Sequence, residues 1–128
     1  MRYMLLIYQV EGDPAAGAEA SMADMQPWID YTNWLAASGM LRAGDPLAPS
    51  SAATSVRVQG DRRLVTDGPF AETKEVLGGY YILECDDLDA ALDAAARCPA
   101  ARDGTMEVRP IVDFAMPTAA PGEAAAAG

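Results

Sequence analysis

Residues 1–10 predict a β-strand whose two faces are both apolar. Side chains along a strand point alternately to opposite faces of a sheet, so two sets of residues can be separated. One face carries Tyr3, Leu5 and Ile7, and the other carries Met4, Leu6 and Tyr8. Because neither set is polar, we expect both faces of this strand to be covered in the folded protein.

An amphipathic helix is predicted from Pro27 to Ser38. Proline suits the first position of a helix, because the N–H that it lacks would be unpaired there. Residues 21–26 are a candidate for an earlier helical turn, with a bend at Pro27. The apolar side of this helix is formed by Trp28, Tyr31 and Leu35.

A second helix is predicted after Asp86 or Asp87, either of which can cap its first turn. Its apolar residues recur at the i, i+3, i+4, i+7 and i+8 positions of one helical face. They are Leu88, Ala91, Leu92, Ala95 and Ala96. Pro99 ends this helix.

The remaining apolar segments alternate in the manner of strands. These predicted strands cover residues 40–44, 54–59, 62–66, 79–85 and 105–114. The second and third of them flank Gly60-Asp61, a turn signal that predicts a hairpin. Pro110 lies within the last strand and predicts an edge position or a bulge there. Residues 11–24 and 45–53 are predicted to be loops.

This order of elements predicts an α+β protein with a ferredoxin-like βαββαβ fold and an added hairpin. Two helices can cover only one face of such a sheet, although its first and central strands are apolar on both. The same face of a second copy is the simplest cover for the other side. We therefore expect a homodimer joined sheet to sheet, with clefts at the subunit boundary. The domain is predicted to span residues 1–116, followed by a flexible tail, 117–128, of small residues.

The amino-acid composition and the net charge of the chain limit the kinds of function that it can have. The 128 residues, 51% of them apolar, can fill one core without a disulfide or a metal. The net charge of -10 argues against binding to nucleic acid or to anionic membranes. No signal peptide and no membrane-spanning run is recognisable, which predicts a cytoplasmic protein. Cys85 and Cys98 are predicted to be buried thiols rather than a redox pair.

The absence of histidine excludes several chemistries. A Ser-His-Asp triad, a Cys-His pair and a histidine metal site cannot be formed. Gly78-Gly79 is too weak a signal for a phosphate-binding loop, and no calcium-binding loop is recognisable. We therefore expect no metal and no cofactor.

Residues 67–75, Asp-Gly-Pro-Phe-Ala-Glu-Thr-Lys-Glu, form the most specific motif of the chain. Asp67 either closes a turn on its own backbone or directs its carboxylate into a cleft. Glu72, Lys74 and Glu75 form either a solvated charge cluster or a site in which the lysine binds an anionic group or acts as an acid. Phe70 can fill part of the core.

Tyrosines and one charged pair supply further candidates. Tyr8, Tyr80 and Tyr81 are predicted near the middle of the sheet, where a hydroxyl is either satisfied in the core or directed at a ligand. Glu107 and Arg109 share a strand face and predict an ion pair. Trp28 and Trp34 are expected to pack.

The motif 67–75, with Gly78-Gly79-Tyr80-Tyr81, resembles the DGPF-type branch of the YCII-related proteins. Residues 2–8, 86–92 and 106–111 resemble the same family, so the resemblance covers residues 1–114. It implies a dimeric α+β barrel, similar in fold to cofactor-free monooxygenases and muconolactone isomerases. Some family members carry a His-Asp pair proposed as catalytic. Trp28 and Ala37 fall near those positions here, so that pair cannot operate. DGPF-type proteins are also often encoded with extracytoplasmic-function sigma factors.

Three hypotheses follow for the function. The first is a small-molecule-binding protein, either a simple binder or an enzyme without metal or cofactor, with a polar ligand in a cleft behind the motif. The second is a regulatory module linked to a sigma factor, and the third is a purely architectural motif. The candidate site residues are Asp67, Glu72 and Lys74 for catalysis, and Tyr8, Gly68, Phe70 and Tyr81 for ligand binding.

Overall fold

A four-stranded antiparallel sheet forms the centre of the protein. We describe the protein from a computed structural model, in which residues 1–11, 22–69 and 74–114 are placed. The strands of the main sheet are β1 (Arg2–Val10), β2 (Leu41–Pro46), β5 (Glu75–Glu84) and β6 (Thr105–Pro110). They pair in the order β2-β5-β1-β6, which is the ferredoxin-like arrangement predicted from the sequence.

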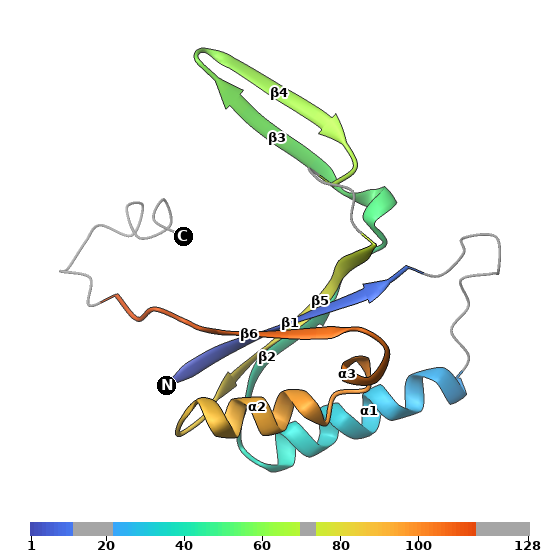
Figure 1. Cartoon of the computed structure of the whole chain (residues 1–128), viewed down its shortest axis with the longest axis vertical. Helices are drawn as coiled ribbons and strands as arrows, with labels where there is room; N and C mark the ends of the chain where they lie inside the picture. Colours follow the sequence, from blue (N-terminus) through green and yellow to red (C-terminus); the bar gives the residue numbers. More distant parts are fainter. Residues whose placement is uncertain (12–21, 70–73, 115–128) are drawn as a thin grey trace.

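The helices lie together on one face of this sheet, as Figure 1 shows. They are α1 (Met22–Ala37), α2 (Leu88–Ala96) and the short α3 (Ala100–Asp103). The predicted hairpin is formed by β3 (Thr54–Gln59) and β4 (Arg62–Asp67), preceded by a 3-10 turn, η2 (Ser50–Ala52). Gly60 and Asp61 form the two-residue turn at its tip, and Gly60 has a φ of 59°. A two-residue turn with positive φ at its first position matches the right-handed twist of the strands that it joins.

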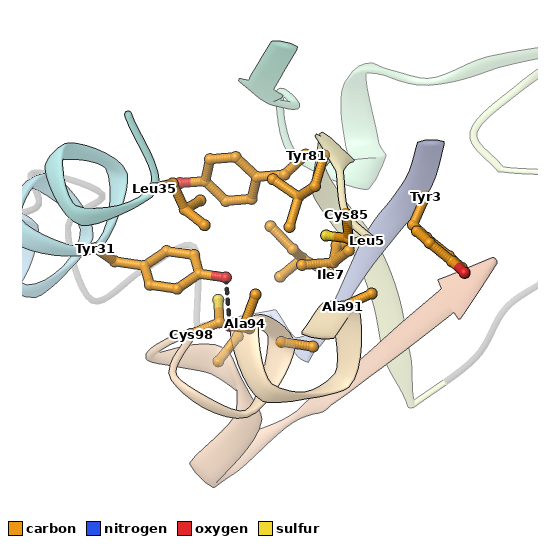
Figure 2. Packing of buried hydrophobic residues seen from close by; sticks show 13 residues of the cluster. Tyr3, Leu5, Ile7, Tyr31, Leu35, Tyr81, Cys85, Ala91, Ala94 and Cys98 are labelled. Carbon is orange, nitrogen blue, oxygen red and sulfur yellow. Dashed lines mark hydrogen bonds between the residues drawn. The ribbon is translucent and has the colours of Figure 1, made fainter. Parts of the chain in front are cut away.

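The core lies between the helices and one face of the sheet (Figure 2). The sheet contributes Tyr3, Leu5, Ile7, Tyr81, Leu83 and Cys85. From the helices come Tyr31, Leu35, Ala91, Ala94, Ala95 and Ala100, with Cys98 between α2 and α3. The alanines of α2 allow that helix to approach closely, and Asp87 caps it by accepting a hydrogen bond from the Ala90 N–H at 2.9 Å.

A hydroxyl inside the core ties the two main helices together. Tyr31 donates a hydrogen bond of 2.7 Å from its hydroxyl to the Ala94 carbonyl, as the dashed line in Figure 2 shows. Its ring also meets the Tyr81 ring edge to face, with centroids 5.5 Å apart. Burial raises the pKa of Tyr31 far above its ordinary value, so the hydroxyl stays protonated and can donate.

The opposite face of the sheet has no helix upon it in the described part of the chain (Figure 1). We call it the open face and define it by Met4, Leu6, Tyr8, Tyr80 and Ile82. The register places Met4 opposite Ile82 and Leu6 opposite Tyr80, and all five side chains are half-buried. The sequence correctly predicted that β1 and β5 are apolar on both faces and that the helices cover one of them.

Two predicted boundaries change near prolines. The first helix begins at Met22, which confirms the earlier turn suggested for residues 21–26 and leaves Pro27 inside the helix rather than at its first position. The predicted loop 11–24 therefore overlaps the start of this helix. Proline at this position removes a hydrogen bond and crowds the preceding turn, a cost that the packing of Tyr31 and Leu35 of the same helix in the core can offset. At the other end of the chain, β6 ends at Pro110 rather than at residue 114. It is an edge strand, as the proline predicted.

Strand β5, one of the two central strands, is also longer than predicted. It begins at Glu75 instead of Gly79, so the last residue of the motif already pairs with Val10 of β1. The register shifts at this point, with Ile7 opposite Gly79 and Tyr8 opposite Leu77, which leaves Gly78 as an extra residue. The bulge lets the strand continue past a pair of glycines that would otherwise weaken it. Helix α3 was not predicted.

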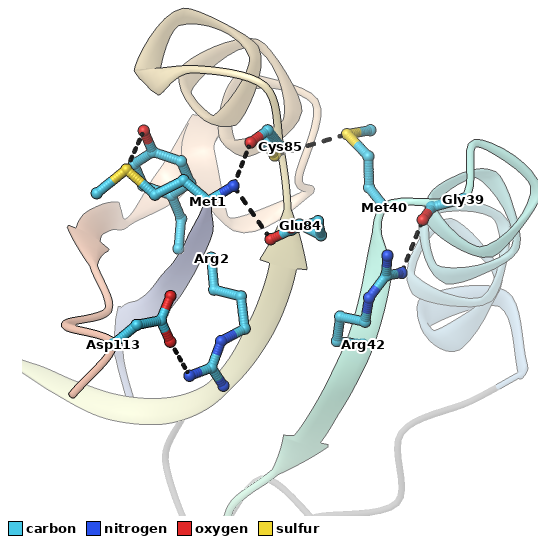
Figure 3. Close-up of polar contacts among 9 residues, drawn as sticks. Met1, Arg2, Gly39, Met40, Arg42, Glu84, Cys85 and Asp113 are labelled. Atoms are coloured by element: carbon cyan, nitrogen blue, oxygen red, sulfur yellow. Dashed lines mark hydrogen bonds and ion pairs between the residues drawn. The ribbon is translucent and has the colours of Figure 1, made fainter. Parts of the chain in front are cut away.

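The N-terminus lies beside the end of β5, and residues 111–113 lie beside the start of β1, as Figure 3 shows for Met1 and Asp113. The N-terminal amine of Met1 donates to the Cys85 carbonyl at 3.1 Å and lies 3.3 Å from the Glu84 carboxylate. Arg2 donates to Asp113 at 2.6 Å, and the Ile111 N–H bonds to the Arg2 carbonyl, so residues 111–113 stay beside β1. These ion pairs are solvent-exposed and contribute little to stability, but they fix the path of the chain.

Both cysteines are buried and free, which confirms the prediction of buried thiols. Burial raises the pKa of Cys98 to about 11, and burial likewise raises the pKa of Cys85. The thiol of the unfolded chain loses its proton near pH 9, whereas Cys98 in the folded chain keeps its proton until about pH 11. The unfolded state therefore binds fewer protons in this window.

We expect the free energy of unfolding to fall as the pH rises from 9 to 11, and the fall to be smaller in Cys98→Ala. Urea unfolding at pH 8, 9 and 10 measures both slopes, and the difference between them isolates the thiol from other titrating groups. Equal slopes in the two proteins would show that Cys98 does not keep its proton preferentially in the folded state.

Candidate functional site

A pocket of about 520 Å³ lies between α1 and the helix-covered face of the sheet. We call it the α1 pocket. Its walls include Trp28, Ile29 and Thr32 of α1, Gly44 of β2, and Gly79 and Tyr81 of β5. Its volume is within the range of small-molecule sites, and its walls are mostly apolar. The pocket is partly open to solvent, so a ligand could enter without unfolding the core.

Glycines on neighbouring strands make room for this pocket. A Cβ atom at Gly44 would lie only 2.5 Å from Cδ1 of Tyr81, its partner across β2 and β5. A Cβ atom at Gly79 would lie 3.0 Å from the Asp45 carbonyl oxygen and 3.6 Å from Cδ1 of Ile7. The missing side chains therefore allow the Tyr81 ring to lie across β2 and reach α1.

The Tyr81 hydroxyl forms a polar contact in the wall of the α1 pocket. It lies 2.8 Å from Oγ1 of Thr32, and either oxygen can be the donor. Burial raises the pKa of Tyr81, and the hydrogen bond to Thr32 opposes that rise in part. The phenol is therefore protonated at neutral pH, and the pair of hydroxyls can both donate to and accept from a ligand.

Charge is scarce around the α1 pocket. Among the described residues that line it, Asp45 is the only one with an ionisable acid or base besides the tyrosines, and no lysine or arginine takes part. The Asp45 carboxylate accepts a hydrogen bond of 2.8 Å from the Tyr80 hydroxyl, and this contact raises the pKa of Tyr80. Across residues 1–11, 22–69 and 74–114, no cluster of acidic and cysteine side chains could hold a metal ion.

The predicted site residues are dispersed. Tyr81 lines the α1 pocket, whereas Tyr8 belongs to the open face on the other side of the sheet. Asp67 ends β4 opposite Thr54, at the base of the hairpin, and Lys74 is exposed just before β5. Phe70 and Glu72 lie outside the described residues, so their roles in the site stay predictions.

Gly68 closes the base of the hairpin. Its φ of 96° favours glycine, and its N–H donates to the Ala53 carbonyl at 2.6 Å. Its own carbonyl accepts a hydrogen bond of 2.7 Å from the Ser55 hydroxyl. This end of the motif therefore has an architectural role, and a direct role for Asp67 and Gly68 in ligand binding is still a prediction.

Thr32 and Gly44 are site residues that the sequence analysis did not identify. Thr32 had a recognisable signal, because it stands four residues after Trp28 and three before Leu35 in the apolar face of the first helix. A polar residue at such a position either finds a partner or lines a cavity. Gly44 had no comparable signal, since its importance depends on the strand pairing that sets it opposite Tyr81.

Several other sequence predictions are confirmed. Glu107 and Arg109 form an exposed ion pair, with Nε and Oε1 3.6 Å apart. Trp28 and Trp34 pack against the core, and the Arg97 guanidinium lies 4.5 Å from the centre of the Trp34 ring system. Within the described residues, no helix combines the length and the apolar character needed to cross a bilayer.

The fold and the pocket define a small ferredoxin-like α+β protein with a cavity between its first helix and its sheet. A sequence model of the YCII-related domain matches residues 1–115, and the chain belongs to this family. An uncharacterised protein of Rhizobium meliloti (strain 1021) is 46% identical over 67 residues, which are 51% of this chain and 54% of that relative. The matched segment thus spans about half the length of each protein.

Proposed function

We propose that this YCII-related protein binds a small uncharged molecule in the α1 pocket. The observation that carries this proposal is the combination of apolar walls with one protonated hydroxyl pair, Thr32 and Tyr81. Such a site suits a ligand with an apolar body and one hydrogen-bonding group, such as a phenol, an aryl ketone or a lactone. The pocket is formed within one chain, whereas the sequence predicted a cleft between two subunits.

Electrostatics favours an uncharged ligand. A carboxylate or phosphate would enter the pocket without a cation to pair with, and the net charge of -10 would repel it as it approached. A cation would also lack a partner, because the Asp45 carboxylate bonds the Tyr80 hydroxyl on the open side of the sheet. A neutral ligand avoids both penalties and still satisfies the hydroxyl pair.

The residues of the pocket are better suited to binding a ligand than to acid–base catalysis. A general base works best with a pKa near the pH of the reaction, whereas burial raises the pKa of Tyr81 away from neutrality. The proposed function is therefore binding, with Tyr81 and Thr32 orienting the polar end of the ligand. Asp67, Glu72 and Lys74 stay candidates for a contribution from the motif.

We also propose that the protein acts as a homodimer joined through the open face. Met4, Leu6 and Ile82 form an apolar patch in the middle of the sheet, and no described helix covers it. A face that is repeated on every copy can pair with itself around a two-fold axis. This arrangement would leave both α1 pockets on the outer, helix-covered sides of the two sheets.

Ligand binding can be tested by calorimetric titration with uncharged phenols, aryl ketones and lactones, each beside its carboxylate analogue. For a neutral compound that binds, Tyr81→Phe and Thr32→Val are each expected to raise Kd by about 2- to 10-fold, the value of one hydrogen bond. Tyr3→Phe is the matched control, because Tyr3 is buried and lies outside the pocket, and within the described residues its hydroxyl bonds only to the Met1 sulfur.

The control protein should bind with the wild-type Kd. Ile29→Trp, which fills the pocket from α1, should abolish binding of the same compounds. Binding that favours the carboxylate analogues, or that is unchanged by Ile29→Trp, would contradict the proposed site.

A further inference from the structure

The β3–β4 hairpin stands apart from the rest of the protein. Its strands pair only with each other, and neither joins the four-stranded sheet. Figure 1 shows it extending away from the helices, beyond the end of the sheet. An isolated two-stranded hairpin is at best marginally stable in water, so this one needs a surface to pack against.

One face of the hairpin is apolar and exposed. Val56 lies opposite Val65, and Val58 follows two residues further along the same face. These three valines are 59%, 59% and 67% exposed, respectively. β-Branched side chains stabilise strands chiefly by packing, and here the described residues of the same chain do not cover them.

The apolar surface continues from the hairpin towards the open face. Leu47 and Leu77, at the end of the sheet next to the hairpin, are 46% and 39% exposed. Leu77 lies opposite Tyr8 of the open face, and the Leu47 N–H bonds to the Gly78 carbonyl at 2.9 Å. The hairpin is therefore placed next to the face that we propose to be the dimer interface.

The charge of the hairpin favours a second copy of this chain as its partner. Residues 54–67 contain Arg57, Arg62 and Arg63 against Asp61 and Asp67, a net charge of +1. Because the whole chain carries -10, the remainder carries -11. The hairpin is thus a weakly cationic apolar arm on a strongly acidic body, and the acidic body of another copy is complementary to it.

We propose that the β3–β4 hairpin is an arm that each copy of this chain extends onto the other, where the face with Val56, Val58 and Val65 packs against the second copy. The arm extends the proposed sheet-to-sheet dimer and does not depend on the α1 pocket. Apolar contact from the valines supplies the binding energy, and the arginines direct the arm to the acidic partner.

A photocrosslinking amino acid at position 58 tests this arm directly. Benzoylphenylalanine in place of Val58 should crosslink two chains, and a mixture of isotopically light and heavy protein should give mixed light–heavy crosslinked peptides. The same amino acid in place of Arg57 is the matched control, because position 57 faces the other side of the hairpin. Crosslinking only within one chain, or equal crosslinking from both positions, would overturn the proposal.

A variant supplies an independent measurement. Val56→Asp/Val58→Asp should raise the dimer Kd by at least about tenfold in sedimentation equilibrium. The α-helical circular dichroism signal should stay unchanged, because the hairpin lies outside the core formed by the helices and the main sheet. Gln59→Asp, on the opposite face, should have little effect. A dimer Kd that is unchanged in the double valine variant would overturn the proposed arm but not the sheet-to-sheet dimer. A monomeric wild-type protein would overturn both proposals.

Discussion

Replacing Leu6 by glutamate is expected to convert the proposed dimer into a monomer. Leu6 lies in the middle of the open face, opposite Tyr80 on one side and Glu107 on the other. In a sheet-to-sheet dimer the new carboxylate would be buried beside the Glu107 carboxylate, which already pairs with Arg109, and a two-fold axis would bury two such pairs of like charges. A cost of about 3 kcal/mol or more raises Kd by about 100-fold or more.

Light scattering after gel filtration measures this change as a halved mass. Leu92→Glu is the matched control, because Leu92 is 46% exposed on α2, on the helix-covered side of the sheet. The control should keep the mass of the wild-type protein. Loss of the dimer in both variants, or in neither, would contradict the assignment of the interface to the open face.

Gly44→Ala is expected to destabilise the protein and to damage the α1 pocket. The new methyl group would lie 2.5 Å from the Tyr81 ring and 3.2 Å from the Tyr80 carbonyl oxygen, closer than unstrained contacts allow. The ring must move, and its hydroxyl then loses the contact with Thr32. Overpacking of this kind costs about 1–3 kcal/mol, which urea unfolding can measure.

A double-mutant cycle separates this clash from a general effect of alanine in β2. In a Tyr81→Ala background the ring is absent, so Gly44→Ala should cost much less than it does in the wild-type protein. Additive costs in the two backgrounds would show that the ring does not determine the need for glycine at position 44.

The sequence predicted the sheet and its helices because their patterns are strong and local. Both alternating sets of β1 are apolar, and α2 shows a clear helical period with Asp87 as its cap. Boundaries were less predictable where proline or glycine stands in a longer element. Pro27 suggested a helix start, but the packing of α1 on the sheet sustains a helix that begins five residues earlier.

The site was less predictable because its geometry comes from tertiary pairing. The most specific motif drew attention to residues 67–75, and its described end at Asp67 and Gly68 closes the hairpin. The pocket instead depends on the register that sets Gly44 opposite Tyr81, and on the passage of α1 over that pair. Tyr81 was a candidate from sequence, whereas its partner Thr32 was identified only from their contact.

We infer that a sheet with two apolar faces uses one for its own helices and the other for a second copy. Sedimentation of the wild-type protein through serial dilution tests this most directly. We expect twice the chain mass of 13.5 kDa, persisting to low concentration. A mass of 13.5 kDa in dilute solution, with Met4, Leu6 and Ile82 accessible to water, would contradict it.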